Sequence, residues 1–77
     1  MKTLDEFVAL FAEQFDETDP QEITADKQFR DLDEWSSLIG LSVIAMIDEE
    51  FDVTLRVEDM RKANTPAALY EIVKSKM

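Results

Sequence analysis

The chain has 77 residues, of which 18 are acidic and 8 are basic, so its formal net charge is −10 at pH 7. A chain of this length forms one small domain, residues 1–77, with little volume for a deep catalytic pocket. The charge disfavours nucleic acid and membrane surfaces as partners. The lack of cysteine and histidine excludes disulfides and thiolate chemistry, and removes the commonest general base and metal ligand.

Neither the first residues nor any later segment carries a long apolar run. A signal peptide and a membrane span both need such a run. A cytoplasmic protein is therefore expected. The chain is also expected to be a monomer.

A first helix is predicted over residues 2–15. Thr3 and Glu6 have the spacing of a capping box, in which each side chain accepts a hydrogen bond from a free backbone N–H of the first turn. Apolar residues at helical spacing give this helix one apolar face: Leu4, Phe7, Val8, Phe11 and Phe15.

Residues 16–36 are predicted to form a long connection, because Pro20 and its polar neighbours break the periodicity. Three isolated apolar residues, Ile23, Phe29 and Leu32, are expected to attach this loop to the core. A loop of this length is unusual in a small domain and is often functional.

The rest of the chain predicts three more helices. The second covers residues 37–51 and a short third covers residues 57–61, whereas the last begins at Thr65-Pro66, a cap followed by proline at the first helical position. The apolar face of the last helix consists of Ala68, Leu69, Ile72 and Val73. The predicted fold class is all-α, a small four-helix bundle of three main helices and one short helix, with a long loop between the first two helices.

The second predicted helix has two apolar stripes. One consists of Gly40, Val43, Ile47 and Phe51, and the other consists of Leu38, Leu41 and Ala45 and ends in Asp48. One stripe should face the core. If the second is exposed beside carboxylates, it suggests a partner surface. The alternative is a central helix with both stripes buried.

From Asp31 to Asp52 the chain has seven acidic residues and no lysine or arginine. Asp31, Asp33 and Glu34 resemble part of a calcium loop but lack its glycine and its late bidentate glutamate, so no metal site is predicted. Ser37 has no histidine partner, and no lysine motif replaces one, so no catalytic residue is predicted.

The start of the second helix resembles the acyl carrier protein family. The family pattern is Asp-Ser-Leu at this place, with an acidic run and a phenylalanine about fourteen positions after the serine. Here Ser37-Leu38 and Asp48-Glu49-Glu50-Phe51 take those positions. Length, helix layout, acidity and the Thr65-Pro66 start of the last helix agree, so the resemblance covers essentially the whole chain.

The resemblance implies a carrier and not an enzyme. Ser37 would bear a 4'-phosphopantetheine arm, taken from coenzyme A and attached through a phosphodiester by a phosphopantetheinyl transferase. The arm ends in a thiol that holds acyl groups as thioesters in fatty-acid, polyketide or related acyl biosynthesis. The free N–H groups and the dipole at a helix N-terminus favour such an anion. Enzymes that load, condense or transfer acyl groups would dock through basic patches.

The chain departs from the family pattern at four positions, which suggests a specialised carrier. Ser36 replaces the usual Asp before the attachment serine, and Ser42 stands where many members carry Glu. Ile39 is apolar where a polar residue is common, and Trp35 is much bulkier than the usual small residue. Asp33 and Glu34 are candidates to replace the missing acid. The predicted partner-binding residues are Trp35, Ser36, Leu38, Leu41, Ser42, Ala45, Asp48 and Glu49.

Alternatives remain open for several of these residues. Ser37 has the simpler role of a helix N-cap, with Ser36 as a competitor for it. Trp35 either covers the junction between loop and helix or touches the arm or a partner. Asp48 and Glu49 have the alternative of an ordinary solvated face. For the chain as a whole, the alternatives are an aminoacyl, peptidyl or D-alanyl carrier and, in another class, an acidic protein-interaction module without an arm.

Overall fold

Thr3 starts the first helix, and the structure, a computed structural model that describes residues 2–77, confirms the predicted capping box. The Glu6 N–H donates to Thr3 Oγ1 (3.2 Å), and the Thr3 N–H donates to Glu6 Oε1 (3.0 Å). The helix α1 (Leu4–Ala12) places Phe7 and Phe11 in the core.

The predicted end of this helix at residue 15 is wrong, because α1 stops at Ala12. The last i→i−4 hydrogen bond runs from Glu13 N to Ala9 O, and Gln14 N and Phe15 N donate to carbonyls only three residues back. The next N–H groups, those of Asp16 and Thr18, donate to the carboxylate of Glu34 at 2.7 and 2.8 Å, so the chain leaves the helical path. Phe15 still reaches the core as predicted, with its ring centroid 5.5 Å from that of Phe11.

The connection after α1 contains two single turns of 3₁₀-helix, η1 (Pro20–Glu22) and η2 (Phe29–Asp31). Ile23 and Phe29 are buried and Leu32 packs against the core, which confirms that these residues attach the loop. A backbone hydrogen bond from Phe29 N to Asn64 O (3.1 Å) fastens it to the connection before the last helix, and one from Ala67 N to Ala25 O (3.0 Å) fastens it to the first turn of that helix.

The helix α2 (Ser37–Phe51) has the predicted bounds. Gly40, Val43, Ile47 and Phe51 are all buried, so this stripe faces the core. The helix ends at Asp52, whose φ of 56° is the left-handed conformation that stops the helix and turns the chain.

The short helix α3 (Val57–Lys62) and the last helix α4 (Pro66–Ser75) complete the bundle. Asp59 accepts a hydrogen bond from the Arg56 N–H (3.0 Å), which is the main reason why the pKa of Asp59 lies below its ordinary value. Thr65 caps α4 as predicted, since Ala68 N donates to Thr65 Oγ1 at 3.1 Å.

The prediction is wrong for one residue of the apolar face of α4. Ala68 is exposed, whereas Leu69, Tyr70 and Val73 are buried. Tyr70 is drawn inward because its ring packs on Phe7 and its hydroxyl donates to the Lys2 carbonyl. The helix therefore faces α1 with the side that carries Tyr70, and Ala68 lies off that side.

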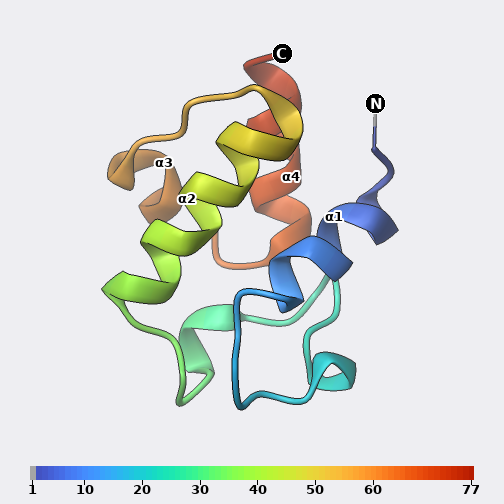
Figure 1. Cartoon of the computed structure of the whole chain (residues 1–77), viewed down its shortest axis with the longest axis vertical. Helices are drawn as coiled ribbons and strands as arrows, with labels where there is room; N and C mark the ends of the chain where they lie inside the picture. Colours follow the sequence, from blue (N-terminus) through green and yellow to red (C-terminus); the bar gives the residue numbers. More distant parts are fainter. Residues whose placement is uncertain (1) are drawn as a thin grey trace.

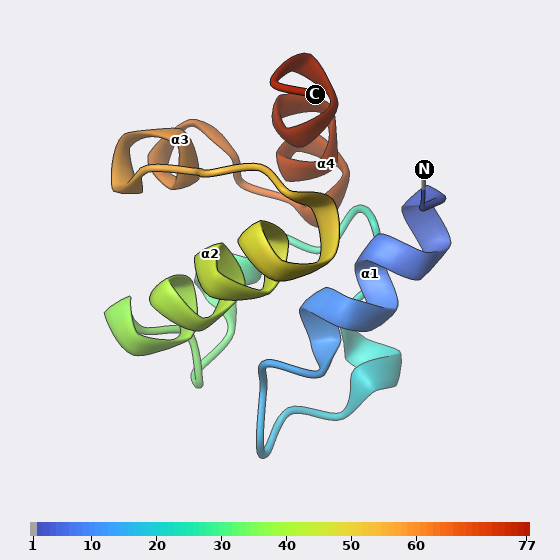
Figure 2. The same cartoon turned by 45° about the horizontal axis from the view of Figure 1, so that its top comes forward.

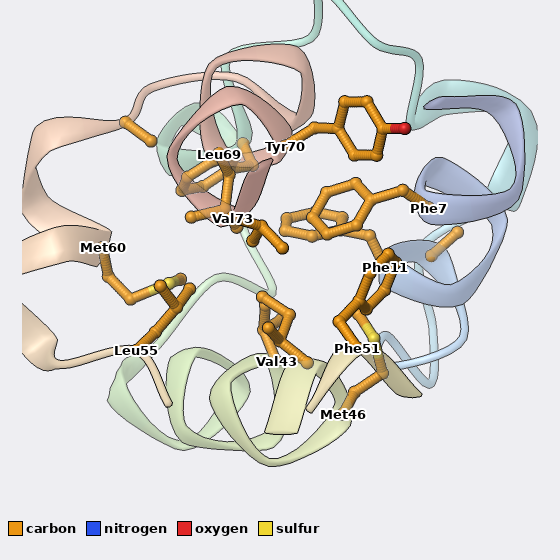
Figure 3. Close-up of a cluster of buried hydrophobic side chains, with 14 of the residues drawn as sticks. Phe7, Phe11, Val43, Met46, Phe51, Leu55, Met60, Leu69, Tyr70 and Val73 are labelled. Carbon is orange, nitrogen blue, oxygen red and sulfur yellow. The ribbon is translucent and has the colours of Figure 1, made fainter. Parts of the chain in front are cut away.

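The four helices form the predicted all-α bundle, and the described part of the chain has no strand. Helix α2 lies between α1 and α3, and α4 packs against α1 and α3 (Figures 1 and 2). Figure 3 shows Phe7 and Phe11 of α1, Val43 and Phe51 of α2, and Leu69, Tyr70 and Val73 of α4 converging on one core. The long loop closes one end of this bundle and leads directly into α2 (Figure 1).

Candidate functional site

Two serines at the start of α2 have different roles. Ser36 is the N-cap, with extended backbone, and its side-chain oxygen accepts from Ile39 N at 3.4 Å. Ser37 is the first helical residue and is exposed, and its hydroxyl has no hydrogen-bond partner within residues 2–77. The interpretation of Ser37 as the cap is therefore wrong, because Ser36 holds that position and leaves the Ser37 hydroxyl free.

The first turn of α2 presents unused donors beside this hydroxyl. The first backbone hydrogen bond of the helix runs from Gly40 N to Ser36 O (3.0 Å), and the Ser36 side-chain oxygen accepts a hydrogen bond from the Ile39 N–H. Among the described residues, the N–H groups of Ser37 and Leu38 have no acceptor. Together with the helix dipole, these donors favour an anion at the Ser37 end of the helix.

A cleft of about 300 Å³ opens next to the two serines, between α2 and α3. It is lined by Arg30, Trp35, Ser36, Ser37, Gly40, Leu41, Ile44, Val57, Met60 and Arg61. A Cβ atom on Gly40 would lie 3.7 Å from the Trp35 ring, an ordinary contact, so close packing does not demand glycine there. Without a side chain, Gly40 leaves the wall of the cleft open.

The second apolar stripe of α2 faces away from the core. Leu38 is 75% exposed and Leu41 is 54% exposed, and Ala45 and Asp48 are also exposed. The alternative that both stripes are buried is therefore wrong. Ser42 and Glu49 are exposed on the same side of the helix, so six of the predicted partner residues share one face: Leu38, Leu41, Ser42, Ala45, Asp48 and Glu49.

Trp35 joins the core to the cleft. Its ring centroid lies 4.5 Å from that of Phe29 and 6.3–6.5 Å from those of Phe15 and Phe11. The same side chain lines the cleft beside Ser37. It thus covers the junction between loop and helix, and also stands where it can contact a group attached at Ser37.

Sequence reasoning missed the residues that the loop and α3 bring to the cleft. Arg30 comes from η2, whereas Val57, Met60 and Arg61 come from α3. Val57 is 51% exposed and so extends the exposed apolar surface of α2. The only signal in the sequence is that these residues lie in segments next to α2 in the predicted bundle.

Glu34 holds the loop that leads into this site. Its carboxylate accepts hydrogen bonds from Thr18 Oγ1 (2.7 Å) and from the backbone N–H groups of Asp16, Glu17 and Thr18 (2.7–3.0 Å). The Thr18 side-chain hydrogen bond is the largest cause that lowers the pKa of Glu34, and the backbone donors add to it. Glu34 therefore fastens the end of α1 to the start of α2.

Replacing Glu34 by glutamine is expected to lower the free energy of unfolding at neutral pH, because an amide is a weaker acceptor for these donors. Since the folded pKa of Glu34 is lowered, its contribution is present above the ordinary value of 4.5 and is lost as the pH falls through the folded pKa. The difference in stability between the variant and the parent should thus shrink as the pH falls below 4.5. Urea unfolding at neutral pH and at a series of lower pH values measures this.

Glu22→Gln is the matched control, because Glu22 is exposed in the same loop and accepts no hydrogen bond from side-chain or backbone donors of residues 2–77. An equal stability loss in both variants would contradict the role of Glu34.

The comparisons with known proteins agree with this geometry. The family described as "phosphopantetheine attachment site" matches residues 5–73. No curated protein and no solved structure shows significant similarity to the chain. Residues 2–77 contain no helix that is both long and apolar enough to cross a membrane, and no group of three acidic side chains placed to hold a metal ion.

The family and the site fit each other. The attachment of phosphopantetheine requires an accessible hydroxyl and a place for a phosphodiester anion, and the start of α2 offers a free serine and unused N–H donors. The match extends over nearly the whole chain and includes α2 and α3 completely and most of α1 and α4. The chain therefore belongs to the family of phosphopantetheine-binding carrier proteins, which hold this group covalently and do not themselves catalyse a reaction.

Proposed function

We propose that Ser37 bears the phosphopantetheine group and that the chain carries acyl groups as an acyl carrier protein. The observation that supports this most directly is the exposed, unbonded hydroxyl of Ser37 at the first position of α2, beside the cleft. Ser36 is the weaker candidate because its side-chain oxygen accepts from Ile39 N.

The chain's own groups hold and present the attached arm. The Ser37 Oγ forms the ester bond to phosphorus, and the N–H groups of Ser37 and Leu38 face the resulting anion. When bound, phosphopantetheine supplies the thiol that this cysteine-free chain lacks. The apolar residues Leu41, Ile44 and Met60 line the cleft beside it.

Intact mass spectrometry tests this proposal. After incubation with a broad-specificity phosphopantetheinyl transferase and coenzyme A, the mass should rise by one phosphopantetheine group. Fragment ions of the peptide that contains both serines should place the added mass on Ser37. An unchanged mass, with a second carrier protein modified in the same mixture, would contradict the proposal.

The exposed face of α2 is the proposed docking surface for the transferase and for acyl-loading or condensing enzymes. It combines apolar side chains, Leu38 and Leu41, with the carboxylates of Asp48 and Glu49. No cation within residues 2–77 pairs with Asp48 or Glu49. These charges are therefore free to attract the basic patch of a partner.

Asp48→Lys is expected to slow phosphopantetheine transfer by about tenfold at low salt, because it places a like charge opposite a basic partner. The difference should shrink at about 0.5 M salt, where charges are screened over a few ångströms. Steady-state rates measured at both salt concentrations check this.

Glu71→Lys is the control for net charge. Glu71 is exposed on α4 and forms only an exposed pair with Lys74 at 4.0 Å. If the two variants slow transfer equally, the effect comes from overall charge and not from this face.

Fatty-acid, polyketide or related acyl biosynthesis is the proposed setting. An aminoacyl, peptidyl or D-alanyl carrier is the alternative within the family, and the mass of a cargo on protein from its native cell separates these possibilities. The acidic interaction module without an arm is the candidate of another class, and it predicts an unmodified chain that binds a basic protein in a salt-sensitive way.

A further inference from the structure

The cleft beside Ser37 has a charge opposite to that of the rest of the molecule. The chain carries a net charge of −10, yet two arginines and no aspartate or glutamate line this cleft. Its remaining lining consists of serines, glycine and apolar side chains. An anionic ligand would therefore meet its most favourable surroundings here.

Arg30 is held in place at the cleft by the end of α3. Its Nη2 donates to Met60 O (2.6 Å) and to Ala63 O (3.4 Å), and its guanidinium lies 5.7 Å from the centre of the Phe29 ring. A guanidinium has five N–H donors, so further donors remain for a ligand. Because these contacts fix the side chain, little conformational entropy is left to lose on binding.

Arg61 is the more available of the two cations. It is exposed in the last turn of α3, and no carboxylate of residues 2–77 lies within ion-pair distance. It lines the same cleft as Ser37, although the two residues belong to different helices. A free guanidinium beside the attachment serine is placed to contact an anion bound there.

The size and lining of the cleft restrict the ligand. A volume of about 300 Å³ lies at the small end of the range for ligand pockets. The apolar part of the lining includes Leu41, Ile44, Val57 and Met60, so a short apolar segment next to an anionic group suits it. A long alkyl chain would not be enclosed.

We propose that Arg61, supported by Arg30, makes this cleft an anion-binding site for the group carried at Ser37. The anion is either the phosphodiester at the serine or a carboxylate at the end of a short acyl cargo. This inference rests on the proposed attachment at Ser37 and adds the residue that holds the attached group against the protein.

The test compares Arg61→Gln with Lys62→Gln. Both residues are exposed, adjacent and in the last turn of α3, so both changes remove one charge and the same interaction with the helix dipole, but only Arg61 lines the cleft. Each protein is prepared unmodified, with phosphopantetheine, with butyryl-phosphopantetheine and with succinyl-phosphopantetheine. Mass spectrometry verifies each form, and thermal unfolding gives the change in Tm on modification.

If the phosphodiester is the ligand, Arg61→Gln should lower the Tm gain by about 4 °C or more in all three modified forms, relative to Lys62→Gln. If the cargo carboxylate is the ligand, the loss should occur in the succinyl form alone. The indole N–H resonance of Trp35, which lines the cleft, should shift on modification in the parent and less in Arg61→Gln.

Equal Tm changes and equal Trp35 shifts in Arg61→Gln and Lys62→Gln would overturn the role of Arg61 while leaving the attachment at Ser37 intact. A chain whose mass does not change would overturn both. The two failures are therefore distinguished by the mass spectrum alone.

Discussion

Ser37→Ala is expected to abolish phosphopantetheine attachment completely, whereas Ser36→Ala is expected to leave the extent of modification unchanged. The hydroxyl of Ser37 is exposed and free, and it stands at the first helical position beside the unused N–H donors. Ser36 instead caps the helix by accepting from Ile39 N. Intact mass after reaction with a transferase and coenzyme A measures both variants.

Stability should show the opposite pattern, because Ser36→Ala should lower the free energy of unfolding more than Ser37→Ala does. Loss of the Ser36 cap should cost about 0.5–1 kcal/mol of unfolding free energy, the low end for caps because the hydrogen bond is long at 3.4 Å. Ser37→Ala should cost nothing, since alanine is the best helix former. If Ser36→Ala lost modification while Ser37→Ala kept it, the assignment of the two serines would have to be exchanged.

Among the variants proposed here, Trp35→Ala is expected to lower the free energy of unfolding most, by about 2–3 kcal/mol. The indole packs against Phe29, Phe11 and Phe15, and truncating a buried aromatic leaves a cavity that the surroundings fill only in part. The value lies below the range for fully buried aromatics because Trp35 is only partly buried. Urea unfolding followed by circular dichroism measures the change.

Two further variants show whether a loss of stability in Trp35→Ala comes from lost packing in the core. Leu38→Ala removes an apolar side chain that is 75% exposed, and it should change stability by less than about 0.5 kcal/mol. Trp35→Phe retains an aromatic ring and should recover part of the loss. If Trp35→Ala cost no more than Leu38→Ala, Trp35 would not be part of the core.

The helices with long apolar periodicity could be predicted from the sequence, and α2 has the predicted bounds because Gly40, Val43, Ile47 and Phe51 repeat on one side. The end of α1 could not be predicted in this way. The helical ladder changes at Gln14 and Phe15, and Asp16 N then donates to Glu34, which is 18 residues away along the chain. No local pattern reports such a distant acceptor. The place of Tyr70 and Ala68 on α4 likewise depends on what α1 presents to that helix.

The candidate site was predictable only where it lies on a single element. The stripe of α2 that is exposed follows from helical spacing, whereas Ser37 was indicated by the resemblance to the acyl carrier protein family. The sequence does not show that Ser36 is the cap, because serine is favoured as a cap at either position. Only the backbone conformation decides whether Ser36 or Ser37 is the cap. Arg30 and Arg61 meet at the cleft through the packing of the loop and α3 against α2, which sequence spacing does not encode.

The two ends of the described chain lie far from Ser37. Lys2, Glu50, Phe51, Asp52 and Met77 line one surface hollow, and the Lys2 ammonium is 3.6 Å from the Glu50 carboxylate. This places both ends beside the last turn of α2, as Figure 1 also shows. The helix has 15 residues, and Ser37 is the first of them, so Ser37 lies about 20 Å from the last turn of the helix. An affinity tag, a fluorophore or a solid support joined at either end would thus lie far from the serine but beside Asp48 and Glu49 of the proposed docking surface. Transfer rates that test this surface therefore require protein that is untagged and free in solution.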